Sequence, residues 1–110
     1  PPPPAGRLLE AADELLVAAV SWYELAWLAE RQRIVIDVPI RSWLENLSAQ
    51  VRTVGITPAI ADSAVALPSS FPRDPTDRLI YATAIERGVK LVTKDRAIAE
   101  HDRARSLVVW

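Results

Sequence analysis

Acidic side chains stand close to the expected ends of strands or the starts of helices at three points of the chain. Glu24 comes shortly after an apolar, strand-like run, and Asp95 closely follows a second one. Asp77 lies in the first turn of a helix that Asp74 is expected to cap. Because open parallel sheets bind their ligands outside the carboxyl ends of the strands, these carboxylates can meet in one crevice.

A group of carboxylates without nitrogen or sulfur partners favours hard divalent cations. The chain has one His and no Cys, so imidazole clusters and thiolate sites are excluded. Mg²⁺ and Mn²⁺ prefer carboxylate and water oxygens as ligands. In phosphodiester hydrolysis such ions neutralise the phosphate and activate a water molecule. The acidic residues therefore indicate a magnesium or manganese site.

Each of these acids also has a purely structural interpretation. Glu24 fits a capping box with Ser21, in which the two residues satisfy the first amides of a helix. Asp77 can cap its own helical turn, and Asp95 can be an ordinary N-cap. Acidic residues are favoured at helix N-termini by the macrodipole in any case. Spacing alone leaves both interpretations open.

Basic residues flank the acids. They are Arg73, Arg78, Lys94 and Arg96. One interpretation is that they bind the phosphate backbone of a nucleic acid. The other is that they are solvated partners of nearby carboxylates, since exposed ion pairs are common and weak. The net charge of −1 gives no global attraction to a polyanion, so any such site must be a local patch.

The elements that must position these residues alternate between strands and helices. Strands are expected at Leu15–Val20, Arg52–Ile56, Val89–Thr93 and Leu107–Val109, with a brief extended segment at Ile34–Ile36. Helices are expected at Arg7–Ala12, Ser21–Arg33, Pro39–Gln50, Ala59–Leu67, Asp74–Arg87 and Asp95–His101. Such alternation predicts an α/β fold with a mostly parallel sheet and helices on both faces.

Length and composition narrow the class of protein. The 110 residues are enough for one domain spanning 1–110, in which the proline-rich residues 1–6 are expected to be flexible. No apolar run approaches the ~20 residues of a membrane span. The absence of Cys fits a reducing compartment. No Gly-rich phosphate loop is present, and a single His does not support a Ser–His–Asp triad.

Three segments of the sequence resemble the PIN-domain toxins. AVSWYELAWL is similar to the family segment in which a strand ends in Val-Ser and a Glu follows. RDPTDRLIYATAIERGVKLVTKDRAI resembles the central block of the family, and the final LVVW resembles the closing strand of the VapC-type subgroup. The resemblance extends from about Leu8 to Trp110.

This resemblance implies a fold, an activity and a set of site residues. The fold is a three-layer α/β/α arrangement, and the activity is endonucleolytic cleavage of RNA that depends on Mg²⁺ or Mn²⁺. Glu24, Asp77 and Asp95 match acidic metal ligands, while Asp74 matches an acidic position that caps the helix or orients the site. The implied protein is a cytoplasmic homodimer that a cognate antitoxin inhibits.

The sequence departs from the family at its beginning. The family starts with a strand that carries an Asp, and nothing in Pro1–Glu14 matches that strand. We therefore expect the first strand and one metal ligand to be missing, and the nuclease activity of the chain as given to be weak or absent. The alternative function is a catalytically incomplete module that acts only in dimerisation or antitoxin binding. A related magnesium phosphatase is disfavoured, because it needs a nucleophilic Asp after a first strand.

Three tryptophans are candidates for large buried contacts. Trp22, Trp27 and Trp43 are expected to pack in the core or at a dimer interface, because aromatic residues dominate such burial. The alternative is that they anchor an antitoxin helix in a groove.

Overall fold

Strands and helices alternate along the described part of the chain, as the sequence predicts. The computed structural model describes residues 15–89, 91–92 and 108–109. The elements in chain order are β1 (Leu16–Ala18), α2 (Ala19–Glu30), α3 (Ile40–Ser48), β2 (Arg52–Val54), α4 (Pro58–Ala66), α5 (Pro75–Arg87), β3 (Leu91–Val92) and β4 (Val108–Val109). The helices expected at Arg7–Ala12 and Asp95–His101 lie outside the described residues.

The strands pair in two parallel ladders. β1 pairs with β2, so that Leu16 lies opposite Arg52, and β3 pairs with β4, so that Leu91 lies opposite Val108. Parallel strands need crossover connections, and the helices between β1 and β2 supply one. The predicted α/β class with parallel strands is therefore confirmed.

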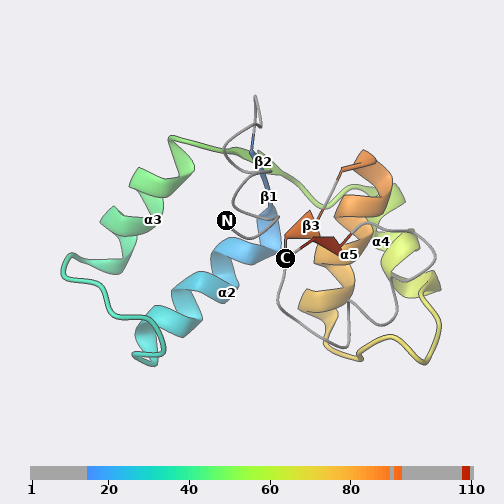
Figure 1. Cartoon of the computed structure of the whole chain (residues 1–110), viewed down its shortest axis with the longest axis horizontal. Coiled ribbons are helices and arrows are strands. Elements are labelled where there is room, and N and C mark those ends of the chain that lie inside the picture. The colour runs from blue at the N-terminus through green and yellow to red at the C-terminus, as the bar shows by residue number, and fades with distance from the viewer. Residues whose placement is uncertain (1–14, 90, 93–107, 110) are drawn as a thin grey trace, which may run out of the picture.

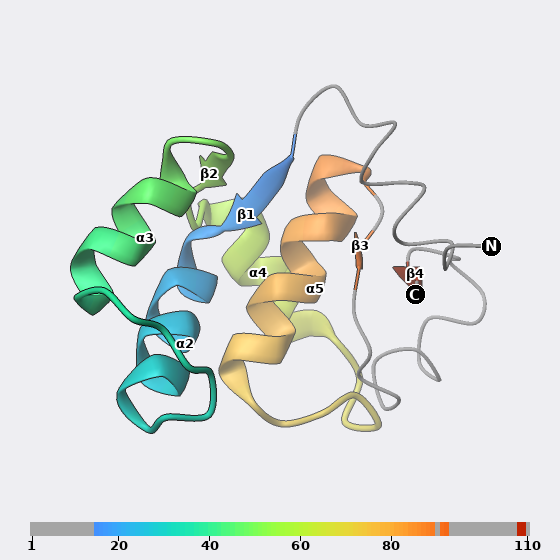
Figure 2. The ribbon, with the colours of Figure 1, turned by 60° about the vertical axis from the view of Figure 1, so that its left-hand side comes forward.

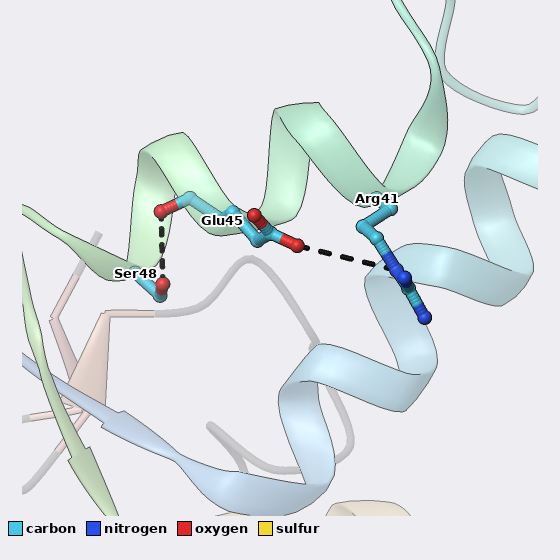
Figure 3. Close-up of polar contacts among 3 residues, drawn as sticks. All are labelled: Arg41, Glu45 and Ser48. Carbon is cyan, nitrogen blue, oxygen red and sulfur yellow. Dashed lines mark hydrogen bonds and ion pairs between the residues drawn. The ribbon is translucent and has the colours of Figure 1, made fainter.

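Helices flank the β1–β2 ladder on two sides. The ladder lies between the pair α2–α3 and the pair α4–α5 (Figures 1 and 2). Arg41 and Glu45 form an exposed ion pair on α3, with 4.0 Å between Nε and Oε1 (Figure 3). Such a surface pair contributes little to stability. Among the described residues, no helix is long and apolar enough to cross a membrane.

The first hydrophobic cluster joins β2 to α4 and α5. Its buried members are Val54, Ile60, Ala64 and Ala82, and the half-buried Leu16 and Leu79 pack against them. The small side chains of Ala64 and Ala82 face this contact, which lets the backbones of α4 and α5 approach each other closely. The cluster therefore fixes α5, the helix that carries two of the predicted site residues, to the sheet.

The ends of α4 and α5 are capped as the sequence predicts. The Thr57 hydroxyl accepts a hydrogen bond from the Ile60 amide at 3.2 Å at the start of α4. The Asp74 carboxylate accepts one from the Thr76 amide at 2.9 Å at the start of α5. α5 stops at Gly88, whose φ of 64° is left-handed and favours glycine.

The start of α2 differs from the prediction. The helix begins at Ala19 instead of Ser21, and its N-cap, Ala18, makes no side-chain capping bond. The capping box that would pair Ser21 with Glu24 is therefore wrong. The physical reason is that alanine has the highest helix propensity, so Ala19 starts the helix inside the expected strand, while Ala18 stays in β1. The segment Ile34–Ile36, expected to be extended, is not a strand.

Candidate functional site

Glu24 lies in the second turn of α2, on a helix that packs against α5. Its side chain is half-buried. Burial raises the pKa of Glu24 above its ordinary value, and the negative charge of Asp74 raises this pKa further. Because Glu24 is not at the helix start, it cannot cap the first amides of α2, and the capping interpretation of this residue fails. Glu24 is therefore a half-buried acid on α2 that is repelled by the negative charge of Asp74 at the start of α5.

Asp74 and Asp77 both stand at the N-terminus of α5. Asp74 is exposed and accepts the Thr76 amide as the helix cap, which confirms its predicted capping role. Asp77 lies in the first turn and is half-buried. The positive end of the helix dipole stabilises negative charge at both positions. The packing of α2 on α5 thus brings Glu24 and Asp74 into one electrostatic environment.

The structure does not describe Asp95, the third predicted metal ligand. Asp95, together with the flanking Lys94 and Arg96, lies outside the described residues. Among the residues that are described, no group of three or more His, Cys, Asp or Glu side chains is placed to hold a metal ion. The assignment of Glu24, Asp77 and Asp95 as a ligand set therefore stays a prediction.

The two arginines beside the site differ in their surroundings. Arg73 is exposed directly before Asp74. Arg78 is half-buried, and its guanidinium group donates hydrogen bonds to five backbone carbonyls between residues 64 and 72. These contacts occupy the donors that a phosphate group would need. The structure thus gives Arg78 a role other than the RNA contact that its position in the sequence predicts.

The tryptophans do not share one environment. The Trp22 indole is half-buried, and its Nε1 donates a hydrogen bond to the Thr53 hydroxyl at 2.9 Å, which links α2 to β2. Trp27 is 41% exposed, with the Arg31 guanidinium carbon 4.4 Å from its ring centroid. Trp43 is half-buried on α3. Packing within this chain thus accounts for Trp22 better than for Trp27.

The raised pKa of Glu24 predicts a pH-dependent stability. A raised folded pKa means that Glu24 stabilises the fold below its unfolded value of 4.5, and that this contribution is lost as the pH rises through the folded pKa. Glu24→Gln imitates the protonated acid. We therefore expect the variant to unfold at a higher temperature than the metal-free parent at about pH 7, with the difference closing as the pH falls to about 4.

The matched control for this experiment is Glu30→Gln, an exposed position on the same helix. Calorimetric melting of both variants across the pH range measures the effect. If Glu24→Gln were less stable than the parent at neutral pH, or if its advantage did not change with pH, the electrostatic description of Glu24 would be rejected.

The chain is similar to known proteins in sequence and in fold. The PIN domain family matches the chain over residues 4–104. Ribonuclease VapC22 of Mycobacterium tuberculosis (strain ATCC 25618 / H37Rv) is 62% identical over 106 residues, which make up 96% of this chain and 82% of that protein. A chain from a toxin–antitoxin complex of Klebsiella pneumoniae superposes with a TM-score of 0.69 at 20% identity, covering 96% of this chain and 82% of that chain. The structural match supports the α/β fold.

Proposed function

Because this chain belongs to the PIN-domain family and is of its VapC type, we propose that it is a divalent-metal-dependent endoribonuclease toxin. The 62% identity to a protein named as a ribonuclease supports RNA as the substrate. The structural observation that carries the proposal is that the Glu24 carboxylate is half-buried on α2 and close enough to Asp74 for the two negative charges to repel each other.

The residues present fit a hard divalent cation. Burial and the Asp74 charge both penalise the ionised form of Glu24, and a nearby cation reverses that penalty. We assign Glu24, Asp77 and Asp95 as the residues that would hold Mg²⁺ or Mn²⁺, with Asp74 orienting the start of α5. An ion bound there supplies charge neutralisation at the phosphate and a water of lowered pKa.

The RNA backbone needs positive charge close to these acids. We propose Arg73, Lys94 and Arg96 as its contacts, because each of them is the direct sequence neighbour of Asp74 or Asp95. Arg78 is left out of this set, since backbone carbonyls occupy its guanidinium group. Phosphate contacts of this kind make affinity depend on salt rather than on sequence.

The partners of the protein follow from the same proposal. A cognate antitoxin is supported by the structural match to a chain of a toxin–antitoxin complex. We further propose that the protein acts as a homodimer in the cytoplasm, where its RNA substrate is found. Size-exclusion chromatography with light scattering measures the dimer directly, and a monomer at micromolar concentration would reject it.

Removal of metal is the experiment that tests the proposed activity. We expect RNA cleavage in Mn²⁺ or Mg²⁺ and none in excess EDTA, with recovery when Mn²⁺ is restored. An ion that binds the folded state and not the unfolded state also stabilises the protein. The gain in the free energy of unfolding is about 2.7 kcal/mol when the free ion concentration is a hundred times its Kd. A rise in the unfolding temperature with Mn²⁺ therefore checks binding independently of cleavage.

Asp62→Asn, an exposed acid on α4, is the control for nonspecific effects of surface charge. Cleavage that persists in EDTA would contradict the metal-dependent mechanism. Mn²⁺ binding without any cleavage of RNA would instead favour a non-catalytic module that acts through its partners.

A further inference from the structure

The guanidinium group of Arg78 lies in a cage of backbone carbonyls. Its Nε donates to Pro72 at 3.0 Å, its Nη1 to Ala64 and Leu67 at 3.1 Å each, and its Nη2 to Pro68 at 3.0 Å and Phe71 at 3.4 Å. Arginine carries five N–H donors in a fixed planar fork. The five donors thus match five acceptors, which come from the end of α4 and the loop between α4 and α5.

Arginine meets two needs of this loop at once. The carbonyls of Ala64 and Leu67 stand at the C-terminal end of α4, where carbonyls carry partial negative charge, and the Ala64 carbonyl accepts only a long backbone bond of 3.4 Å from the Leu67 amide at the helix cap. Pro68 and Pro72 add acceptors to the loop but no N–H donors of their own. The segment therefore has a surplus of acceptors, and a cationic side chain with many donors compensates for it.

The same side chain is fixed to the start of α5. Arg78 directly follows Asp77, and its backbone amide donates to the Asp74 carbonyl at 3.1 Å in the first turn of the helix. The Phe71 ring is 5.8 Å from the Arg78 guanidinium carbon and 5.1 Å from the Tyr81 ring. The position of the α5 N-terminus relative to α4 thus depends on Arg78 from one side and on Phe71 from the other.

We infer that Arg78 is a positioning residue for the proposed metal site: it clamps the α4–α5 loop and thereby holds the start of α5, which carries Asp77 and its cap Asp74. This inference rests on the proposed function, because it assigns the purpose of the clamp to metal binding. Residues that orient metal ligands without touching the metal typically contribute about 10- to 100-fold to metal affinity.

The test compares Arg78→Lys with the parent protein and with Arg41→Lys. Lysine keeps the charge but has three donors on a point-like ammonium group, so it cannot reproduce the fork. Arg41 is the matched control, because it lies in the exposed ion pair on α3 (Figure 3), and α3 and the α4–α5 loop are at opposite sides of the molecule (Figure 1). Mn²⁺ affinity is measured by electron paramagnetic resonance at a temperature where each variant is fully folded, and loop mobility is measured by hydrogen exchange.

We expect Arg78→Lys to bind Mn²⁺ about tenfold more weakly than the parent and to exchange its α4–α5 loop amides faster. Arg41→Lys should bind within about twofold of the parent, as expected for a surface substitution. A folded Arg78→Lys protein with the Mn²⁺ affinity of the parent would overturn the inference while leaving the proposed function intact. A parent that binds no Mn²⁺ would overturn the proposed function and the inference together.

A second variant keeps the test decisive if Arg78→Lys does not fold. Phe71→Leu loosens the other anchor of the loop and leaves Arg78 unchanged. Faster exchange of the loop with severalfold weaker Mn²⁺ binding would support the inference. Faster exchange with unchanged Mn²⁺ affinity would show that the loop position does not matter to the metal site, and would overturn it.

Discussion

Asp77→Asn is expected to reduce RNA cleavage at least about 100-fold while the protein stays folded. Asparagine has nearly the same shape as aspartate, so the half-buried position in the first turn of α5 is still filled. The substitution removes the negative charge that a divalent cation requires. Even the loss of a group that only supports the metal ligands lowers metal affinity or activity about 10- to 100-fold. Single-turnover cleavage of RNA in Mn²⁺ measures the effect.

The control for Asp77→Asn is Asp62→Asn, which removes a charge of the same kind from the exposed face of α4. It should leave the cleavage rate within about twofold of the parent, because surface substitutions away from a site have small effects. Circular dichroism confirms that both variants are folded. Cleavage by Asp77→Asn at the rate of the parent would remove Asp77 from the site.

Phe71→Ala is expected to destabilise the protein by about 3 to 5 kcal/mol, the usual cost of truncating a buried phenylalanine. The Phe71 side chain is 1% exposed and packs against Tyr81, which is fully buried, with Leu67 and Ile85 beside them. Urea denaturation of the metal-free protein measures the change in the free energy of unfolding.

Val65→Ala is the control for loss of an apolar side chain, because Val65 is 83% exposed on α4. Its cost should stay within about 0.5 kcal/mol. A loss of less than about 1 kcal/mol in Phe71→Ala would mean that the loop is not held by this contact, and the account of the second hydrophobic cluster would be wrong.

Local signals in the sequence were sufficient for the ends of α4 and α5. Thr57, Asp74 and Gly88 act through hydrogen bonds or backbone angles within a few residues, so their residue types already determine what they do. The parallel pairing also follows from local information, because alternating strands and helices restrict the connections that a sheet can have.

The roles of Glu24 and Arg78 could not be predicted in this way. A capping box and a site acid have the same spacing from Ser21; the observed start of α2 at Ala19 excludes the capping box, and the site role of Glu24 stays a proposal. The partners of Arg78 lie up to 14 residues away and are main-chain atoms, which leave no mark in the sequence. The one available signal was the pair of prolines at 68 and 72, which adds carbonyls without amides.

The clamp at Arg78 has a consequence for how the protein can change over evolutionary time. Its five hydrogen bonds go to main-chain oxygens, so the side chains that the loop displays do not take part in them. Ser69 and Ser70 stand exposed between the carbonyls that the clamp holds. Substitutions at these loop positions can therefore change what the surface beside α5 recognises without breaking the hydrogen bonds that hold the loop backbone.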